Sequence, residues 1–188
     1  GDIVECGVWK GGLMQLAALA LMELGDTSRK IYLYDTFEGM PEPGEFDLDW
    51  ADNSPYDNWK SMKWESSSSK CSKFGFGGLL EAVQTTMATT NYPEDKIILV
   101  QGLVEETIPN TQPSQISYLR LDTDWYSSTA HELDNLYPIL SVGGVLVIDD
   151  YGYYKGSRKA TDEYIKKNNI RILLSRISNL GVREGVKQ

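Results

Sequence analysis

The sequence predicts an α/β protein built on an open, mostly parallel sheet with helices on both faces. Short apolar segments rich in Ile, Val and Leu alternate along the 188 residues with longer segments whose apolar residues recur at helical spacing. Strands that alternate with helices pair in parallel through right-handed crossovers, so that helices cover both faces of the sheet. The chain is long enough to bury a sizeable core, and we expect a single domain over 1–188.

Each element follows from local pattern. Buried strands are predicted at 2–6, 30–35, 95–102, 114–122 and 143–150. Helices are predicted at 11–25, 75–90, 127–140 and 155–168. The buried face predicted for the first helix, which ends at Gly25 as its C-cap, consists of Leu13, Leu16, Ala17, Ala20, Leu21 and Leu24. The last two segments, 170–177 and 179–186, are close enough to form a terminal hairpin, which makes the final strand antiparallel.

One segment interrupts this alternation. Residues 36–73 carry three prolines, three tryptophans and a serine run at 66–69, with little periodicity. A long aperiodic stretch inside a compact domain is commonly a functional lid or a disordered segment, and tryptophans argue against disorder. We therefore expect a lid-like insertion; the alternative is a satellite hydrophobic cluster under a surface loop.

Composition argues against several classes of function. A formal net charge of −9 does not suit a protein that binds nucleic-acid phosphates or an anionic membrane surface. No apolar run approaches the roughly 18 residues that span a bilayer, and two cysteines without a signal peptide favour a reduced, cytoplasmic setting. The single histidine, His131, lies inside a predicted helix, so Ser-His-Asp and zinc sites have little support.

The first strand ends in "ECGVWKGG", where an open α/β sheet binds its ligands. Gly7 and Gly11 allow a tight turn and a close approach of the backbone to a ligand, and the following helix N-terminus favours an anionic group. Glu5 could accept a hydrogen bond from a cationic ammonium group. The alternative for Glu5 is a buried acid that backbone N–H groups satisfy.

The second strand ends in Asp35, where an acid is expected to grip the two hydroxyls of a ribose. Its alternative is a turn or cap aspartate. Together with Glu5, this pattern indicates an adenosine-type ligand with an amino-acid-like end, which describes S-adenosylmethionine. A nicotinamide-dependent oxidoreductase would use the same sheet, but the G-x-G-x-x-G fingerprint is absent.

Four acids follow two further strands: Asp122 and Asp124, then Asp149 and Asp150. If these strands are neighbours, the carboxylates converge, and crowded carboxylates either take up protons or surround a cation. Oxygen ligands without histidine or cysteine favour a hard divalent ion, most plausibly Mg²⁺. In the alternative, Asp124 and Asp150 cap the following helices or turns and the other two face solvent.

Five stretches now resemble a known family in its own order along nearly the whole chain. They are "GDIVECGVWKGG", "YDTFEGMP", "GLVEETIP", "LRLDTDWYSSTAHELDNLYPILSVGGVLVIDDYG" and "GSRKATDEY". The chain is similar to the macrocin O-methyltransferase family, which belongs to the class I S-adenosylmethionine-dependent methyltransferases and acts on macrolide and aminocoumarin sugars.

The resemblance implies a Rossmann-like class I methyltransferase fold with a seven-stranded sheet. It implies Mg²⁺ bound by Asp122, Asp149 and Asp150, and Asp124 as a candidate general base. The cofactor pocket that it implies includes Glu5, Gly7, Gly11, Asp35, Thr36, Gly102 and Asp122.

The acceptor implied by the resemblance is a small molecule with a free hydroxyl, expected to be a sugar, although a catechol would also fit chemically. Members of the family carry additional helical sequence before the first strand, which helps to close the pocket and form the oligomer. We therefore expect a homo-oligomer and a missing N-terminal helical segment, with a cofactor-binding but catalytically incomplete domain as the alternative.

Overall fold

A seven-stranded sheet in the order β5-β2-β1-β6-β7-β9-β8 forms the centre of the computed structural model, which describes residues 1–64, 70–108 and 110–188. Its strands are β1 (Asp2–Cys6), β2 (Ile31–Asp35), β5 (Ile97–Gln101), β6 (Ile116–Leu121), β7 (Leu140–Ile148), β8 (Ser175–Arg176) and β9 (Arg183–Val186). The first five pair in parallel, whereas β9 pairs antiparallel with both β7 and β8. The predicted sheet with its terminal antiparallel hairpin is confirmed.

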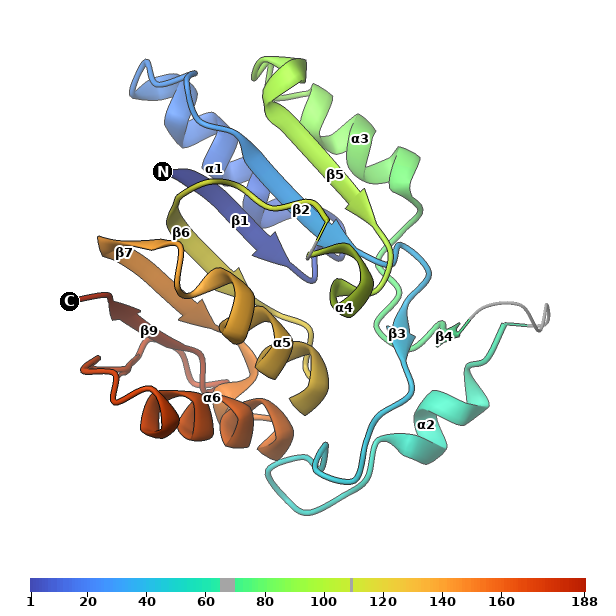
Figure 1. Ribbon diagram of the computed structural model, residues 1–188. Coiled ribbons are helices and arrows are strands. Elements are labelled where there is room, and N and C mark those ends of the chain that lie inside the picture. The colour runs from blue at the N-terminus through green and yellow to red at the C-terminus, as the bar shows by residue number, and fades with distance from the viewer. Residues whose placement is uncertain (65–69, 109) are drawn as a thin grey trace.

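Alternate residues of β1, β2, β5 and β6 enter two separate cores, because successive side chains of a strand point to opposite faces. In β2, Ile31 and Leu33 pack with α1 (Gly12–Glu23) and α3 (Leu80–Ala88), while Tyr32 and Tyr34 pack with the helices of the other face. That other face carries α4 (Val104–Thr107), α5 (Tyr126–Leu136) and α6 (Lys155–Lys167) (Figure 1). Short 3₁₀ turns, η1 (Glu94–Lys96) and η2 (Asp150–Gly152), complete the body. Within the described residues, no helix combines the length and apolar character needed to cross a bilayer.

The buried face predicted for α1 is only partly right, because Ala17 and Leu21 pack against the core whereas other residues of the predicted set are exposed. Its buried residues are Met14 and Ala18, whereas Leu16 and Leu24 are 62% and 79% exposed. Apolar residues cover most of the circumference of this helix, so their spacing alone does not select the side that meets the sheet.

Helix α3 also begins later than predicted, at Leu80. Gly75 and Gly78 have φ angles of +66° and +156°, which a right-handed helix cannot contain.

The described part of the insertion, residues 36–64 and 70–73, lies beyond the carboxyl ends of the parallel strands (Figure 1). It contains the antiparallel pair β3 (Met40–Pro41) and β4 (Cys71–Ser72), and the short helix α2 (Tyr56–Ser61). Trp59 is 1% exposed, and its Nε1 donates a hydrogen bond to the carbonyl of Met40 at 2.8 Å. A buried tryptophan thus organises the described part of the insertion, and the serine run at 66–69 lies outside the described residues.

Asp47 attaches the insertion to the helical layer. Its buried carboxylate accepts hydrogen bonds from the backbone N–H groups of Gly44 and Tyr126, each at 2.7 Å. Tyr126 is the first residue of α5, so Asp47 caps that helix from a distant part of the chain. A Cβ atom at Gly156, near the start of α6, would lie 1.9 Å from Oδ1 of Asp47. The absence of a side chain at Gly156 therefore permits this contact.

Candidate functional site

A cavity of about 280 Å³ opens at the carboxyl ends of the parallel strands. The predicted site residues that line it are Gly7, Asp35, Thr36, Gly102, Asp122 and Asp124. Met40 and Pro41 of the insertion and Trp9 of the loop after β1 line it as well. The insertion therefore forms one wall of the cavity that the strand ends define.

Gly7 brings the end of β1 against the end of β6. Its φ angle is +84°, and a Cβ atom there would lie 1.9 Å from the carbonyl oxygen of Asp122. Only glycine combines this conformation with so close an approach. Gly11, in contrast, caps α1 and packs against Val83 of α3, so the structure places it outside the residues that line the cavity.

Asp35 lines the cavity and also organises the loop after β1. Its Oδ2 accepts hydrogen bonds from the N–H groups of Val8 and Trp9 at 2.7 and 3.1 Å, and its Oδ1 accepts one from Phe37 at 2.7 Å. The carboxylate therefore serves as a turn aspartate. Because carboxylate oxygens have about four acceptor sites in all, it retains capacity for a ligand hydroxyl.

Glu5 lies beneath the cavity, outside the residues that line it. It is 1% exposed, and its Oε1 accepts a hydrogen bond from Nη1 of Arg120 at 2.8 Å, while its buried Oε2 has no hydrogen-bond partner among the described residues. Burial raises the pKa of Glu5 to about 7, and the charge of Arg120 opposes that rise. The cation that the structure places against Glu5 is thus an internal arginine.

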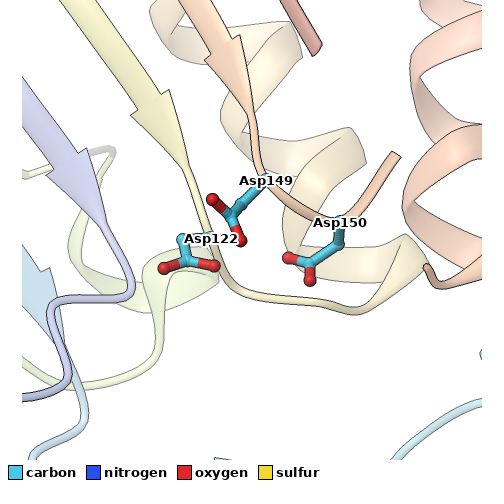
Figure 2. A group of neighbouring side chains, drawn as sticks. All are labelled: Asp122, Asp149 and Asp150. Atoms are coloured by element: carbon cyan, nitrogen blue, oxygen red, sulfur yellow. The ribbon is translucent and has the colours of Figure 1, made fainter. Parts of the chain in front are cut away.

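Three of the four predicted acids form one group (Figure 2). Asp122, Asp149 and Asp150 each offer an oxygen atom, and these atoms lie within 4.8 Å of one another. The parallel pairing of β6 and β7 causes this convergence, since Leu121 and Ile148 are partners in register and the acids follow them directly. The fourth acid, Asp124, hydrogen-bonds to Asp150 and faces the cavity.

Burial and crowding raise the pKa values of Asp122, Asp124 and Asp150. Burial raises the pKa of Asp122 to about 9 and that of Asp150 to about 6. The pKa of Asp124 rises well above its usual value, through burial first and then through the charge of Asp150. Asp150 is 7% exposed, and within the part of the chain that the structure describes its Oδ2 has no hydrogen-bond partner. An orphaned carboxylate oxygen within an oxygen-only donor group fits a hard divalent cation.

The turn that carries Asp124 is held by α5. Asp124 has a φ angle of +66°, a conformation that costs a non-glycine residue free energy and persists where the surroundings enforce it. Next to it, Oγ1 of Thr123 donates a hydrogen bond to Oε1 of the fully buried Glu132 at 2.9 Å. Through the side chain of Glu132, α5 thereby fixes the position of the Asp122–Asp124 segment relative to the cavity.

Arg120 was missed by the sequence reasoning. Its Nη1 donates hydrogen bonds to Glu5 at 2.8 Å and Asp122 at 2.6 Å, and its Nη2 donates one to Asp149 at 2.6 Å. A signal was present, because an arginine within the apolar strand "ISYLRL" needs a buried partner of opposite charge. His131 does not line the cavity, and its buried Nε2 has no hydrogen-bond partner among residues 1–64, 70–108 and 110–188.

Two curated O-methyltransferases are similar in sequence to this chain. The chain is 33% identical over 182 residues to the 8-demethyl-8-(2,3-dimethoxy-alpha-L-rhamnosyl)-tetracenomycin-C 4'-O-methyltransferase of Streptomyces olivaceus. It is 31% identical over 182 residues to the demethyldecarbamoylnovobiocin O-methyltransferase of Streptomyces niveus. Each alignment covers 97% of this chain, and the chain spans 64% of the length of each relative.

Among solved structures, the fold is similar to that of the O-methyltransferase NovP, with a TM-score of 0.82 and 27% sequence identity. That superposition covers 100% of this chain and 72% of the NovP chain. The family described as Macrocin-O-methyltransferase (TylF) matches residues 1–183. Because that match runs from β1 to the first residue of β9 and includes the whole acidic group, the chain belongs to the macrocin O-methyltransferase family.

Proposed function

We propose that this chain carries the catalytic centre of an S-adenosylmethionine- and Mg²⁺-dependent O-methyltransferase that acts on a hydroxyl of a sugar or sugar-bearing small molecule. The observation that carries the proposal is Asp122, which lines the cavity and also belongs to the three-carboxylate group. Asp122 therefore lies both at the wall of the cavity and in the candidate cation site. The names of the two relatives support a sugar-bearing acceptor. One is named for a rhamnosyl-bearing tetracenomycin compound and the other for a novobiocin compound.

The cavity residues would hold the cofactor, whose sulfonium supplies the methyl group. Asp35 would accept hydrogen bonds from the ribose hydroxyls, and Gly7 and Gly102 let the backbone pass close to the ligand. Thr36 lines the same wall. Since methyl transfer is an in-line displacement, the main task of these residues is to align the reacting atoms and exclude water.

The three carboxylates Asp122, Asp149 and Asp150 would hold Mg²⁺, which supplies a Lewis acid for the acceptor hydroxyl. Asp124 lies against Asp150 and faces the cavity, where its carboxylate would accept the proton of that hydroxyl. The insertion at 36–73 forms the wall above the cavity and would act as the lid over the acceptor.

We place the protein in the cytoplasm, where S-adenosylmethionine is made, and expect a homo-oligomer.

The experiment that tests the proposal compares Asp149→Asn with Asp95→Asn, a control at an exposed position on η1. Asp149→Asn should abolish Mg²⁺-dependent methyl transfer and leave the dissociation constant of S-adenosylhomocysteine within about twofold, because Asp149 does not line the cavity. Calorimetry with Mg²⁺ and with EDTA, and methyl transfer to rhamnosyl compounds and to catechols, are the measurements.

Full activity of Asp149→Asn would eliminate the metal-assisted mechanism. Methylation of catechols alone would replace the sugar acceptor. Cofactor binding without transfer to any diol would identify a binding domain that lacks part of the enzyme.

A further inference from the structure

Arg120 is the one cation that the described residues place among the buried acids of the site. Its guanidinium contacts Glu5, Asp122 and Asp149, and its side chain is 15% exposed. Glu5 and Arg120 are register partners on the adjacent strands β1 and β6, whereas Asp149 follows β7. A single side chain therefore connects the ends of three neighbouring strands.

The hydrogen bonds of Arg120 use one oxygen atom of each aspartate. Nη1 contacts Oδ2 of Asp122, and Nη2 contacts Oδ1 of Asp149, each at 2.6 Å. The second oxygen of each carboxylate is left without this contact, and the carboxyl groups turn toward one another and toward Asp150 (Figure 2). Because a guanidinium is planar and its N–H groups have fixed directions, it sets the orientation of both carboxylates at once.

The charge and the geometry of Arg120 have opposite consequences for a divalent cation. A positive charge beside the ligands repels the ion, so charge alone predicts that removal of Arg120 strengthens metal binding. Orientation predicts the reverse, because residues that hydrogen-bond metal ligands contribute about 10- to 100-fold to metal affinity. The two effects can therefore be separated by a substitution that keeps the positive charge and removes the planar fork.

We propose that Arg120 is a positioning residue of the metal site: it holds Asp122 and Asp149 with one free oxygen each directed at a shared divalent cation and ties both to Glu5 beneath them. This inference rests on the proposed Mg²⁺ site. It assigns the buried Glu5 a structural task, which is to anchor the arginine from β1.

Arg120→Lys tests the proposal, because lysine keeps the positive charge and loses the planar fork. The readout is the dissociation constant of Mg²⁺, measured by calorimetry on the metal-free protein. We expect binding at least tenfold weaker in Arg120→Lys. The matched control is Arg29→Lys, which changes an arginine paired with Asp26 just before β2, at the opposite end of the sheet.

A second measurement uses the unaltered protein and so does not depend on whether the variant folds. In protein labelled with ¹⁵N-arginine, the guanidinium N–H signals of Arg120 should stay protected from exchange with water when Mg²⁺ is added, because the arginine remains bound to the aspartates. Loss of that protection would mean that the ion displaces Arg120, which would overturn the proposal.

Three further outcomes have distinct meanings. Equal Mg²⁺ binding by Arg120→Lys would show that Arg120 acts only through its charge, and tighter binding would show that its planar fork does not favour the ion; either result would overturn the positioning role. Equal weakening by Arg29→Lys would also overturn it. No Mg²⁺ binding by the unaltered protein would overturn the metal site itself and this inference with it.

Discussion

Gly7→Ala tests whether the contact between the ends of β1 and β6 shapes the site. The added Cβ atom would lie 1.9 Å from the carbonyl oxygen of Asp122, whereas contacts below 3.0 Å are essentially never seen. The segment at Asp122 must therefore move by about 1.1 Å or more. That segment is held in place, since the N–H of Asp122 donates to the carbonyl of Cys6 at 2.8 Å.

The cost of this substitution has two parts. An alanine at a φ angle of +84° costs about 1–2 kcal/mol in backbone strain. Overpacking against the backbone of Asp122 adds about 1–3 kcal/mol, so the expected loss in the free energy of unfolding is about 2–5 kcal/mol. Because Asp122 lines the cavity, we also expect S-adenosylhomocysteine to bind at least tenfold more weakly.

Gly25→Ala provides the matched control. Gly25 has a φ angle of +70°, and a Cβ atom there would meet nothing within 4 Å, so only the backbone strain applies. Equilibrium unfolding in urea measures the free energy of unfolding, and calorimetry measures ligand affinity. Equal destabilisation by the two substitutions, with unchanged affinity in Gly7→Ala, would refute the idea that this contact sets the geometry of the site.

Two more predictions concern the acids and the insertion. Burial raises the pKa of Asp122 from 3.8 to about 9 in the folded protein, so the stability linked to its protonated form is lost as pH rises between these values. The melting temperature of the metal-free protein should therefore be lower at pH 8 than at pH 5.5. A higher melting temperature at pH 8 would contradict this prediction. Trp59→Phe removes the hydrogen bond to the carbonyl of Met40 and should lower the free energy of unfolding by about 1–3 kcal/mol. The exposed Trp50→Phe should change it by less than about 0.5 kcal/mol, and a similar effect of both in urea unfolding would count against a packed insertion.

The sheet could be predicted from the sequence because its information is local. Each strand is a short apolar run, and the alternation with helices determines parallel pairing. The terminal hairpin was also predicted, although β8 and β9 are shorter than the segments assigned to them. The buried face of α1 was predicted only in part, because a helix with apolar residues on most sides leaves the choice of face to tertiary packing.

The contacts of the site were likewise predictable only in part. The convergence of Asp122, Asp149 and Asp150 follows from the ends of adjacent strands, and the sequence was sufficient to predict it. The partner of Glu5 was not predictable, because its contact with Arg120 spans 115 positions of sequence and depends on the register between β1 and β6. The capping of α5 by Asp47 is likewise a long-range contact, 79 positions apart, within a segment that shows little periodicity.

The contact between Asp47 and Gly156 limits how the insertion of this protein can be moved into another protein. Residues 36–73 transplanted into a relative would keep their docking on α5 and α6 only where that relative has a glycine at the position of Gly156, since a Cβ atom there would lie 1.9 Å from Oδ1 of Asp47. A chimera joined at the ends of the insertion alone would place a side chain against this carboxylate wherever that glycine is lacking. The first turn of α6 therefore has to be transferred together with the insertion.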